Sequence, residues 1–455
     1  MSHERNNRPK LQAPYRFDVG GYHSVIGIYL AINAVPDTWL LVDSADCGTL
    51  RAELIHDNHD WGSTLITEDG RYRIANTGVC PHTVALDRNA ELAGQMTAIG
   101  SGDGSFLFVY PPPVTAIVGL DYAVVARRVQ AQLKMQVVPI NPADTAGGDW
   151  LSGYAYVMGL LARHIQLPAA AKKRNKVALV GYLWDRNEGD NSGSVRELHR
   201  LLEGLGLEVC ATWLSGTATA DLARVAEASV IFELPHAGDA ARILAERTGA
   251  RLVPLHLPVG IESTLAWIDA AAEATARAKR GQALLRAEAA EAYDKVSKPV
   301  AMHFVGRDFA ICTEPYLGLG LAGMVEEFGG YVRVLAFTGR ARAPVPPAFL
   351  AAYLPDASIT QVGDRVGSAA SRSSRPLVLL SNIQVISTVG NAPVASVPIG
   401  FQAGGNHFLL DTPFVGIRGT YSLIDRIVAA STRAVMARAH AGPGGVFWNS
   451  PAHGG

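Results

Sequence analysis

The feature that most constrains the fold is an alternation of apolar runs and helical segments in the middle of the chain. KVALVGYLW (176–184) is a continuous apolar run, as expected of a strand that is buried on both faces. VRELHRLLEGLG then places leucines at helical spacing and ends in glycine. LEVCATWL, TADLARVAEA, SVIFEL, AARILAERTG and RLVPLHL continue the alternation. This order predicts βαβ units and a parallel sheet.

The same alternation appears on both sides of this region. WLLVDSADC, FLFVYPPP and KMQVVPIN are typical of strand ends that lead into loops, and DFAICTE, YVRVLAFTG and RPLVLLSN are typical of strands. Residues 270–298 are rich in Ala, Glu and Arg and predict one long helix. The 455 residues suffice for three domains of about 150 residues each.

We therefore predict an α/β fold of three Rossmann-like domains with parallel sheets. The predicted parts are an N-terminal arm (1–19), an α/β domain with the candidate cysteines (20–175), an α/β domain with a crossover helix (176–298), a third α/β domain (299–440) and a C-terminal tail (441–455).

Composition excludes several classes of function. Lys plus Arg number 40 and Asp plus Glu 41, so the chain lacks the basic excess expected of a nucleic-acid-binding protein. No stretch of about 18 apolar residues predicts a membrane span. The polar start MSHERNNRPKLQAPYR lacks the apolar core of a secretory signal, so we expect a cytoplasmic protein. Four cysteines are too few for a disulfide framework in a chain of this length.

Two of the four cysteines occupy loop-like positions after predicted strands. Cys47 follows the apolar run in LLVDSADCGT, and Cys80 lies between Gly and Pro in GVCPHT. In open α/β sheets ligands bind at the carboxyl ends of the strands, and thiolates are ligands for iron. Spacing alone favours two ordinary thiols. Cys210 and Cys312 lie within or at the end of apolar strands, where core packing is expected.

Other polar motifs are weaker. ELIHDNHDW places His56, His59 and Asp60 as in a metal cluster, although a polar helix end is the better interpretation. GYLWDRNEGDNSGS lacks the spacing of a calcium loop and predicts a solvated loop. GLGLA (318–322) within an apolar helical pattern indicates close packing. The chain has no GxxxxGK[ST] phosphate loop, so we expect no ATP hydrolysis by this chain alone.

The order of these segments resembles the nitrogenase component 1 family, and in particular the β-type subunits of nitrogenase-like reductases. VDSADCGTLRAEL resembles the family's first cluster-cysteine turn, and NTGVCPHTVALDRNAELAGQM resembles the second. VTAIVGLDYAVVARRVQAQLKMQVVPINPAD, RLVPLHLPVGIESTLAWI and TPFVGIRGTYSLIDRI resemble later family segments in the same order. The resemblance covers about residues 20–435.

The resemblance implies an oxidoreductase subunit in a heterotetramer with an α-type partner. It also implies an interfacial iron–sulphur cluster, P-cluster-like or [4Fe–4S], which receives electrons from an ATP-dependent iron protein. Cys47 and Cys80 match the first two cluster cysteines, whereas the third falls at Pro113, which cannot ligate metal. A carboxylate such as Asp46, or the partner, would complete the cluster, and the acidic neighbours Asp43 and Asp46 would lower its potential. The catalytic metallocluster is expected in the partner.

Two functions remain open at this point. The first is electron relay within a nitrogenase-like reductase. Pro113 disfavours dinitrogen reduction, the pigment reductases match residues 40–121 less closely, and carbon–sulphur cleavage, as in methylthio-alkane reductases, fits best. The second is an assembly scaffold that resembles the β-type half of the cofactor-maturation complex. A solute-binding protein is disfavoured by the missing signal segment and the third domain.

Overall fold

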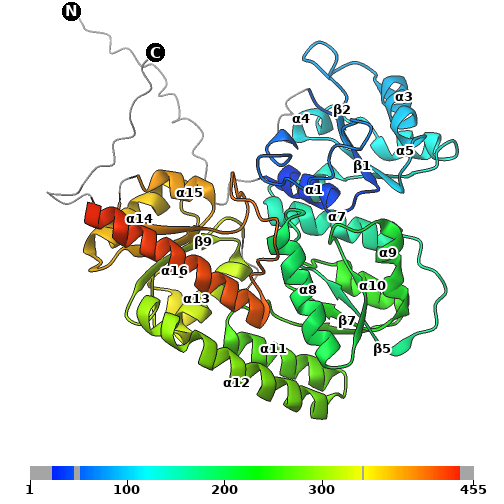
Figure 1. Cartoon of the computed structure of the whole chain (residues 1–455). Helices are drawn as coiled ribbons and strands as arrows, with labels where there is room; N and C mark the ends of the chain where they lie inside the picture. Colours follow the sequence, from blue (N-terminus) through cyan, green and yellow to red (C-terminus); the bar gives the residue numbers. More distant parts are fainter. Residues whose placement is uncertain (1–22, 46–51, 341–342, 391, 441–455) are drawn as a thin grey trace, which may run out of the picture.

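The computed structural model describes residues 23–45, 52–340, 343–390 and 392–440. The predicted arm (1–19), the predicted tail (441–455), Asp46 and Cys47 lie outside the described residues. In the described part, three four-stranded sheets follow one another along the chain, each with helices packed against it (Figure 1). Every strand pair is parallel. The predicted α/β fold of three Rossmann-like domains is confirmed.

The strand orders are β2-β1-β3-β4, β6-β5-β7-β8 and β10-β9-β11-β12. The strands are β1 (Thr38–Val42), β2 (Ile74–Asn76), β3 (Phe106–Tyr110), β4 (Gln136–Pro139), β5 (Lys173–Val180), β6 (Glu208–Thr212), β7 (Ala228–Glu233), β8 (Arg251–Pro254), β9 (Asp308–Thr313), β10 (Tyr331–Phe337), β11 (Leu377–Ser381) and β12 (Val394–Pro398). The apolar strands β1, β3 and β11 are buried along their whole length because helices cover both faces of their sheets.

The helices of the first sheet are α1 (Ser24–Asn33), α3 (Asn89–Gly100), α4 (Pro113–Ala116), α5 (Tyr122–Gln130), α6 (Pro142–Thr145) and α7 (Trp150–His164). The second sheet carries α8 (Gly189–Gly204), α9 (Thr219–Ala223), η1 (Arg224–Glu227), α10 (Ala240–Thr248) and α11 (Ile261–Ala274). The third carries α12 (Ala278–His303), α13 (Pro315–Glu327), η2 (Pro347–Phe349), α14 (Ile359–Arg372), α15 (Ile383–Thr388) and α16 (Gly416–His440). None of the helices in the described ranges has the length and apolar character that crossing a bilayer would require.

Helices α1 and α7 cross at a contact that only glycine permits. A β-carbon added at Gly27 would lie 1.7 Å from the carbonyl oxygen of Trp150, and one added at Gly153 would lie 1.9 Å from that of Ser24. Both distances are far inside van der Waals contact. The backbones of α1 and α7 therefore touch, which fixes how the first sheet sits on the rest of the molecule.

Two expectations about helices have different outcomes. The long helix predicted over 270–298 is confirmed from residue 278 onward as α12, but it does not reach back to 270, because α11 ends at Ala274 and α12 begins at Ala278. Between them Ala276 has a φ of 54°, a left-handed conformation that a continuous helix excludes. The close packing expected of GLGLA (318–322) is confirmed. β-Carbons added at Gly318 and Gly320 in α13 would lie 3.0 Å from Phe337 and 2.8 Å from Val259.

The solvated loop predicted for DRNEGDNSGS is wrong. Asp185, Arg186, Glu188 and Asp190 are buried, and α8 already begins at Gly189. We call these four residues, together with His59 and His407, the polar hub. Arg186 pairs with Asp190, and its Nη1 donates to the carbonyl oxygen of Asn406 at 2.7 Å. Burial is tolerated because opposite charges and backbone groups satisfy one another.

Candidate functional site

The carboxyl ends of all four strands of the first sheet open into one cavity of about 740 Å³. Ala45 follows β1, Cys80 follows β2, Pro113 follows β3 and Thr145 follows β4, and all four residues line the cavity. Most of the remaining lining is apolar or backbone. The cavity therefore occupies the edge at which parallel sheets bind ligands.

Cys80 presents a partly exposed thiol to this cavity. Its Sγ lies 3.5 Å from Thr83 Oγ1, and its own backbone N–H donates to the same oxygen at 3.1 Å. The Thr83 hydroxyl and the backbone N–H groups of His82 and Thr83 lower the pKa of the Cys80 thiol. These contacts favour the thiolate, which is the form that binds metals.

Asp43 lies behind the cavity and does not add free negative charge to it. The buried carboxylate pairs with Arg88 and accepts hydrogen bonds from Thr77 Oγ1 at 2.7 Å and Tyr122 Oη at 2.5 Å. Burial raises the pKa of Asp43, but the bonds from Arg88, Tyr122 and Thr77 outweigh it and hold the pKa below its ordinary value. Because Arg88 pairs with this carboxylate, Asp43 contributes little net charge at the cavity, and its effect on a cluster potential stays a prediction.

An exposed apolar surface adjoins the cavity on the segment that follows β3. Val114, Ile117 and Val118, here called the α4 patch, are 63%, 84% and 42% exposed. Val114 also lines the cavity itself. An exposed apolar patch beside a cavity is typical of a protein–protein interface.

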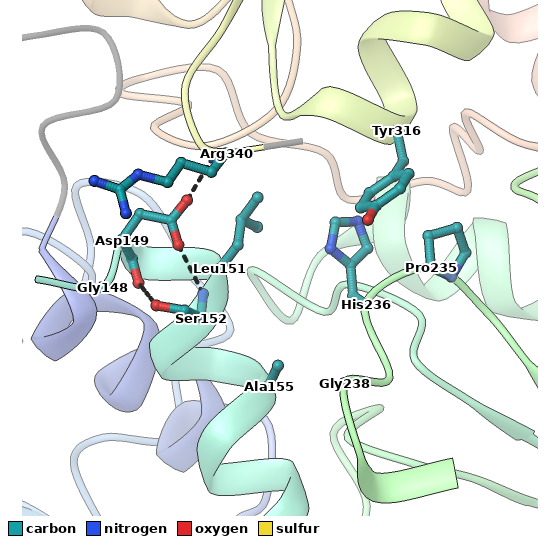
Figure 2. Close-up of a pocket in the computed structure, with 10 residues that line it drawn as sticks. All are labelled: Gly148, Asp149, Leu151, Ser152, Ala155, Pro235, His236, Gly238, Tyr316 and Arg340. Atoms are coloured by element: carbon teal, nitrogen blue, oxygen red, sulfur yellow. Dashed lines mark hydrogen bonds between the residues drawn. The ribbon is translucent and has the colours of Figure 1, made fainter. Parts of the chain in front are cut away.

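A second, smaller cavity of about 230 Å³ lies where the three domains meet (Figure 2). Asp149 is the N-cap of α7 and accepts hydrogen bonds from the backbone N–H groups of Ser152 and Arg340. His236 follows β7 and meets the edge of Tyr316 at 4.9 Å between ring centroids. His236 Nε2 lies 3.2 Å from Glu314 Oε2 but is out of line for a hydrogen bond.

Known proteins resemble this chain in both sequence and fold. The family described as Nitrogenase component 1 type Oxidoreductase matches residues 86–432, which is more than half of the chain. The chain belongs to that family. It is accordingly an oxidoreductase subunit.

Solved structures of family members superimpose on nearly the whole chain. The structure titled nitrogenase Cp1 at pH 6.5 matches with a TM-score of 0.69 and 14% identity, covering 96% of each chain. Nitrogenase Cp1 at pH 5 also gives a TM-score of 0.69, with 13% identity, covering 96% of this chain and 92% of that one. At such low identity these likenesses show the nitrogenase component 1 fold and nothing finer.

One curated relative shares a higher sequence identity with this chain than these structures do, but over a shorter aligned segment. Subunit N of the light-independent protochlorophyllide reductase of Synechococcus sp. (strain CC9605) is 30% identical over 176 residues. The match spans 37% of each chain, so just over a third of that relative is represented. A pigment reductase subunit is thus among the relatives, although we expected pigment reductases to resemble residues 40–121 less closely.

Of the predicted site residues, the structure places Cys80 and Pro113 against the same cavity. Asp46 and Cys47 belong to the range 46–51, which lies outside the described residues and directly follows Ala45. His82, two residues after Cys80, is exposed and is absent from the cavity lining. The assignment of Cys47, Cys80 and Asp46 as cluster ligands stays a prediction.

The histidine motif in ELIHDNHDW joins domains within this nitrogenase-like fold. His59 is fully buried, its Nδ1 accepts from the Ala403 N–H at 2.8 Å, and its Nε2 lies 3.1 Å from the carbonyl oxygen of Asp185. Burial and the charge of Arg186 lower the pKa of His59, which agrees with a neutral ring. No group of three metal-ligating side chains occurs within the described ranges.

Sequence reasoning missed the small cavity at the domain junction. His236 stands in ELPHAG, immediately beyond the apolar run of β7, and Tyr316 follows β9 in the same way. The rule that ligands gather at the carboxyl ends of strands would have indicated both positions. The meeting of the two ends depends on how the second and third domains pack, which no local pattern encodes.

Proposed function

We propose that this chain is the β-type subunit of a nitrogenase-like, ATP-dependent reductase. In this proposal Cys80 and Cys47 hold an iron–sulphur cluster that is shared with an α-type partner. The observation that carries it is the position of Cys80, which faces a cavity at four strand ends beside the exposed α4 patch. The cluster, when bound, would store and transfer electrons on their way to the partner's catalytic centre.

The residues present fit a shared cluster better than one held by this chain alone. Among the described residues that line the cavity, Cys80 alone carries a thiol, and Pro113 offers no ligand atom. Cys47 would add a second thiolate, and Asp46 or the partner would supply the rest. A cluster divided between two chains needs an interface at the cavity mouth, and the α4 patch offers apolar surface for it.

The chain's own side chains would prepare the site before any metal arrives. Thr83 and the adjacent backbone N–H groups stabilise the thiolate of Cys80. The Asp43–Arg88 pair ties the end of β1 to the segment that follows β2. Val79 and Tyr110 are buried in the cavity wall and keep water from that side.

The remaining details of the proposal rest on the sequence. ATP would be hydrolysed by a separate iron protein, the assembly would be a heterotetramer, and we place it in the cytoplasm. Because Pro113 departs from the family's third cysteine, we favour carbon–sulphur bond reduction, as in methylthio-alkane reductases, over dinitrogen reduction. The same departure supports the second candidate, a scaffold on which a cofactor is assembled.

The test is iron and sulphide content of the complex co-purified with its partner, together with electron paramagnetic resonance. Cys80→Ala should lose iron and the cluster signal. Cys210→Ala is the matched control because its thiol is buried in β6 and donates to the Val177 carbonyl. Wild-type iron and spectra in Cys80→Ala would contradict the proposal. Turnover with an iron protein would support a reductase, and transfer of a cluster to an apo-enzyme would support the scaffold.

A further inference from the structure

A groove of about 510 Å³ lies on the third domain between the end of α12 and the C-terminal half of α16. These two helices pack side by side (Figure 1). Met302, His303, Arg307, Arg375 and Val435 contribute to its lining, and we call it the basic groove. Its residues are distant in sequence from those of the Cys80 cavity, and the two share no residue.

Three basic side chains converge in the basic groove. Arg307 is only 4% exposed, and its Nε and Nη2 both donate to the Pro376 carbonyl oxygen, at 3.3 and 3.0 Å. Burial lowers the pKa of His303, and the charges of Arg307 and Arg375 lower it further. Burial and the charge of Arg375 likewise lower the pKa of Arg307. All three groups line the same groove, and because the lowered pKa favours a neutral His303 ring, the positive charge of the groove comes from the two guanidinium groups.

Within the described residues, no carboxylate forms an ion pair with these three groups. Asp308 follows Arg307 in sequence, but its oxygens are bound by Arg333 Nε and Ser373 Oγ at 2.6 Å each. The C-terminal end of α12 supplies about half a negative charge, which does not balance two guanidinium groups. The basic groove thus retains positive charge that a bound anion would neutralise.

Apart from the hydroxyl residues Ser431 and Thr432, the rest of the basic-groove lining is apolar, and much of it is exposed. Met302 is 58% exposed and Val435 is 52% exposed. Methionine side chains adapt to ligands of irregular shape. A volume of about 510 Å³ falls in the range of about 300–1,000 Å³ that is typical of sites for small molecules.

We propose that the basic groove binds a small amphipathic anion, with its head group on Arg375 and Arg307 and its apolar chain along Met302 and Val435. The head is a carboxylate or a phosphate, since guanidinium groups bind both. The ligand is a small molecule rather than a protein segment, because the cavity has the size of a small-molecule site. The proposal is independent of the cluster proposed at Cys80.

Calorimetric titration of the purified complex tests the proposal with four probes. Decanoate and decyl phosphate carry both head and chain, decanol carries the chain alone, and acetate carries the head alone. We expect one decanoate or decyl phosphate per chain, with binding that weakens as salt is added, and no measurable binding of decanol or acetate. The tighter of the two amphipathic probes identifies the head group.

Variants locate the binding. Arg375→Gln removes an exposed guanidinium and should weaken binding at least about tenfold, as expected for a charged hydrogen bond. Val435→Asp places a negative charge, the same sign as that of the ligand's head group, beside the ligand's apolar chain. This variant should abolish binding. Arg286→Gln is the control, because Arg286 is exposed on α12 and bonds only to the Gln282 carbonyl of its own helix. Absence of binding by every probe, equal binding of decanol, or an unchanged affinity in Arg375→Gln would each overturn the proposal.

Discussion

Arg88 pairs with Asp43 across the first sheet, so that one buried ion pair joins the end of β1 to the segment that carries Cys80. The pair also organises its neighbours, since Thr77 and Tyr122 donate to the same carboxylate. Residues that do not line the cavity thus hold the segment that carries Cys80 in place.

Arg88→Met should destabilise the protein strongly, because it leaves the Asp43 carboxylate buried without its cation. Removal of one partner of a buried ion pair typically costs about 3–5 kcal/mol. Urea denaturation at neutral pH measures the free energy of unfolding. The double variant with Asp43→Asn should recover much of the loss. A decrease of less than about 1 kcal/mol in the free energy of unfolding of Arg88→Met would show that the pair contributes little to stability.

Asp43 should also contribute to acid sensitivity. Its pKa is lowered in the folded state, whereas an unfolded Asp titrates near about 3.9. The stabilisation is therefore present above about pH 4 and is lost as the pH falls through the folded-state value. Thermal unfolding between pH 7 and pH 3 should show a smaller acid-induced decline for Asp43→Asn than for the wild type. Parallel curves would refute this assignment.

Asp185 in the polar hub should show the opposite dependence. Burial and the charge of Asp190 raise its pKa to about 7, so the folded protein prefers the protonated carboxyl. Its cost to stability grows as the pH rises from about 4 to about 7 and is complete above that range. Asp185→Asn should therefore stabilise the protein at pH 8 by on the order of 1–3 kcal/mol and have little effect at pH 4. Urea denaturation of the variant and the wild type at both pH values measures this effect. An equal change in the free energy of unfolding at pH 8 and pH 4 would contradict the prediction.

Thr83→Val should raise the pKa of the Cys80 thiol, because the hydroxyl that favours the thiolate is lost. In cluster-free protein, alkylation of the Cys80 peptide by iodoacetamide, followed by mass spectrometry, should then require a more alkaline pH. Thr115→Val is a suitable control, since Thr115 lines the same cavity but donates to the Pro112 carbonyl. Identical alkylation profiles for Thr83→Val and the wild type would exclude a role for Thr83.

Gly27→Ala should destabilise the protein by about 1–3 kcal/mol or more, because its methyl group would collide with the Trp150 carbonyl. Gly159→Ala is a matched control within α7, where an added β-carbon meets nothing within 4 Å. That variant should be neutral or slightly stabilising, since alanine favours a helix. Equal midpoints of urea unfolding for the two variants would argue against a tight α1–α7 crossing.

The sequence predicts the sheets well because strands buried on both faces leave continuous apolar runs, as in β3 and β11. It also places Cys80 at a strand end, where local pattern suffices. The sequence-based prediction fails for residues 185–190, because their many charged side chains favour a solvent-exposed loop. Their burial depends on Trp61 and His407, which are more than 100 residues away and carry no local signal. Arg88 as the partner of Asp43 was missed for the same reason.

Glu188 in the polar hub has a mechanical consequence. One of its oxygens accepts from the Trp61 N–H at 2.9 Å and lies 2.7 Å from His407 Nδ1, and the other accepts from the Phe408 N–H at 2.8 Å. The carboxylate of Glu188 in the second domain thus binds Trp61 of the first domain and His407 and Phe408 of the third. Hinge closure between lobes would have to break these bonds within the buried interior. If the function proposed above holds, any large motion that accompanies electron delivery should therefore occur between subunits, with the described part of this chain moving as one rigid piece.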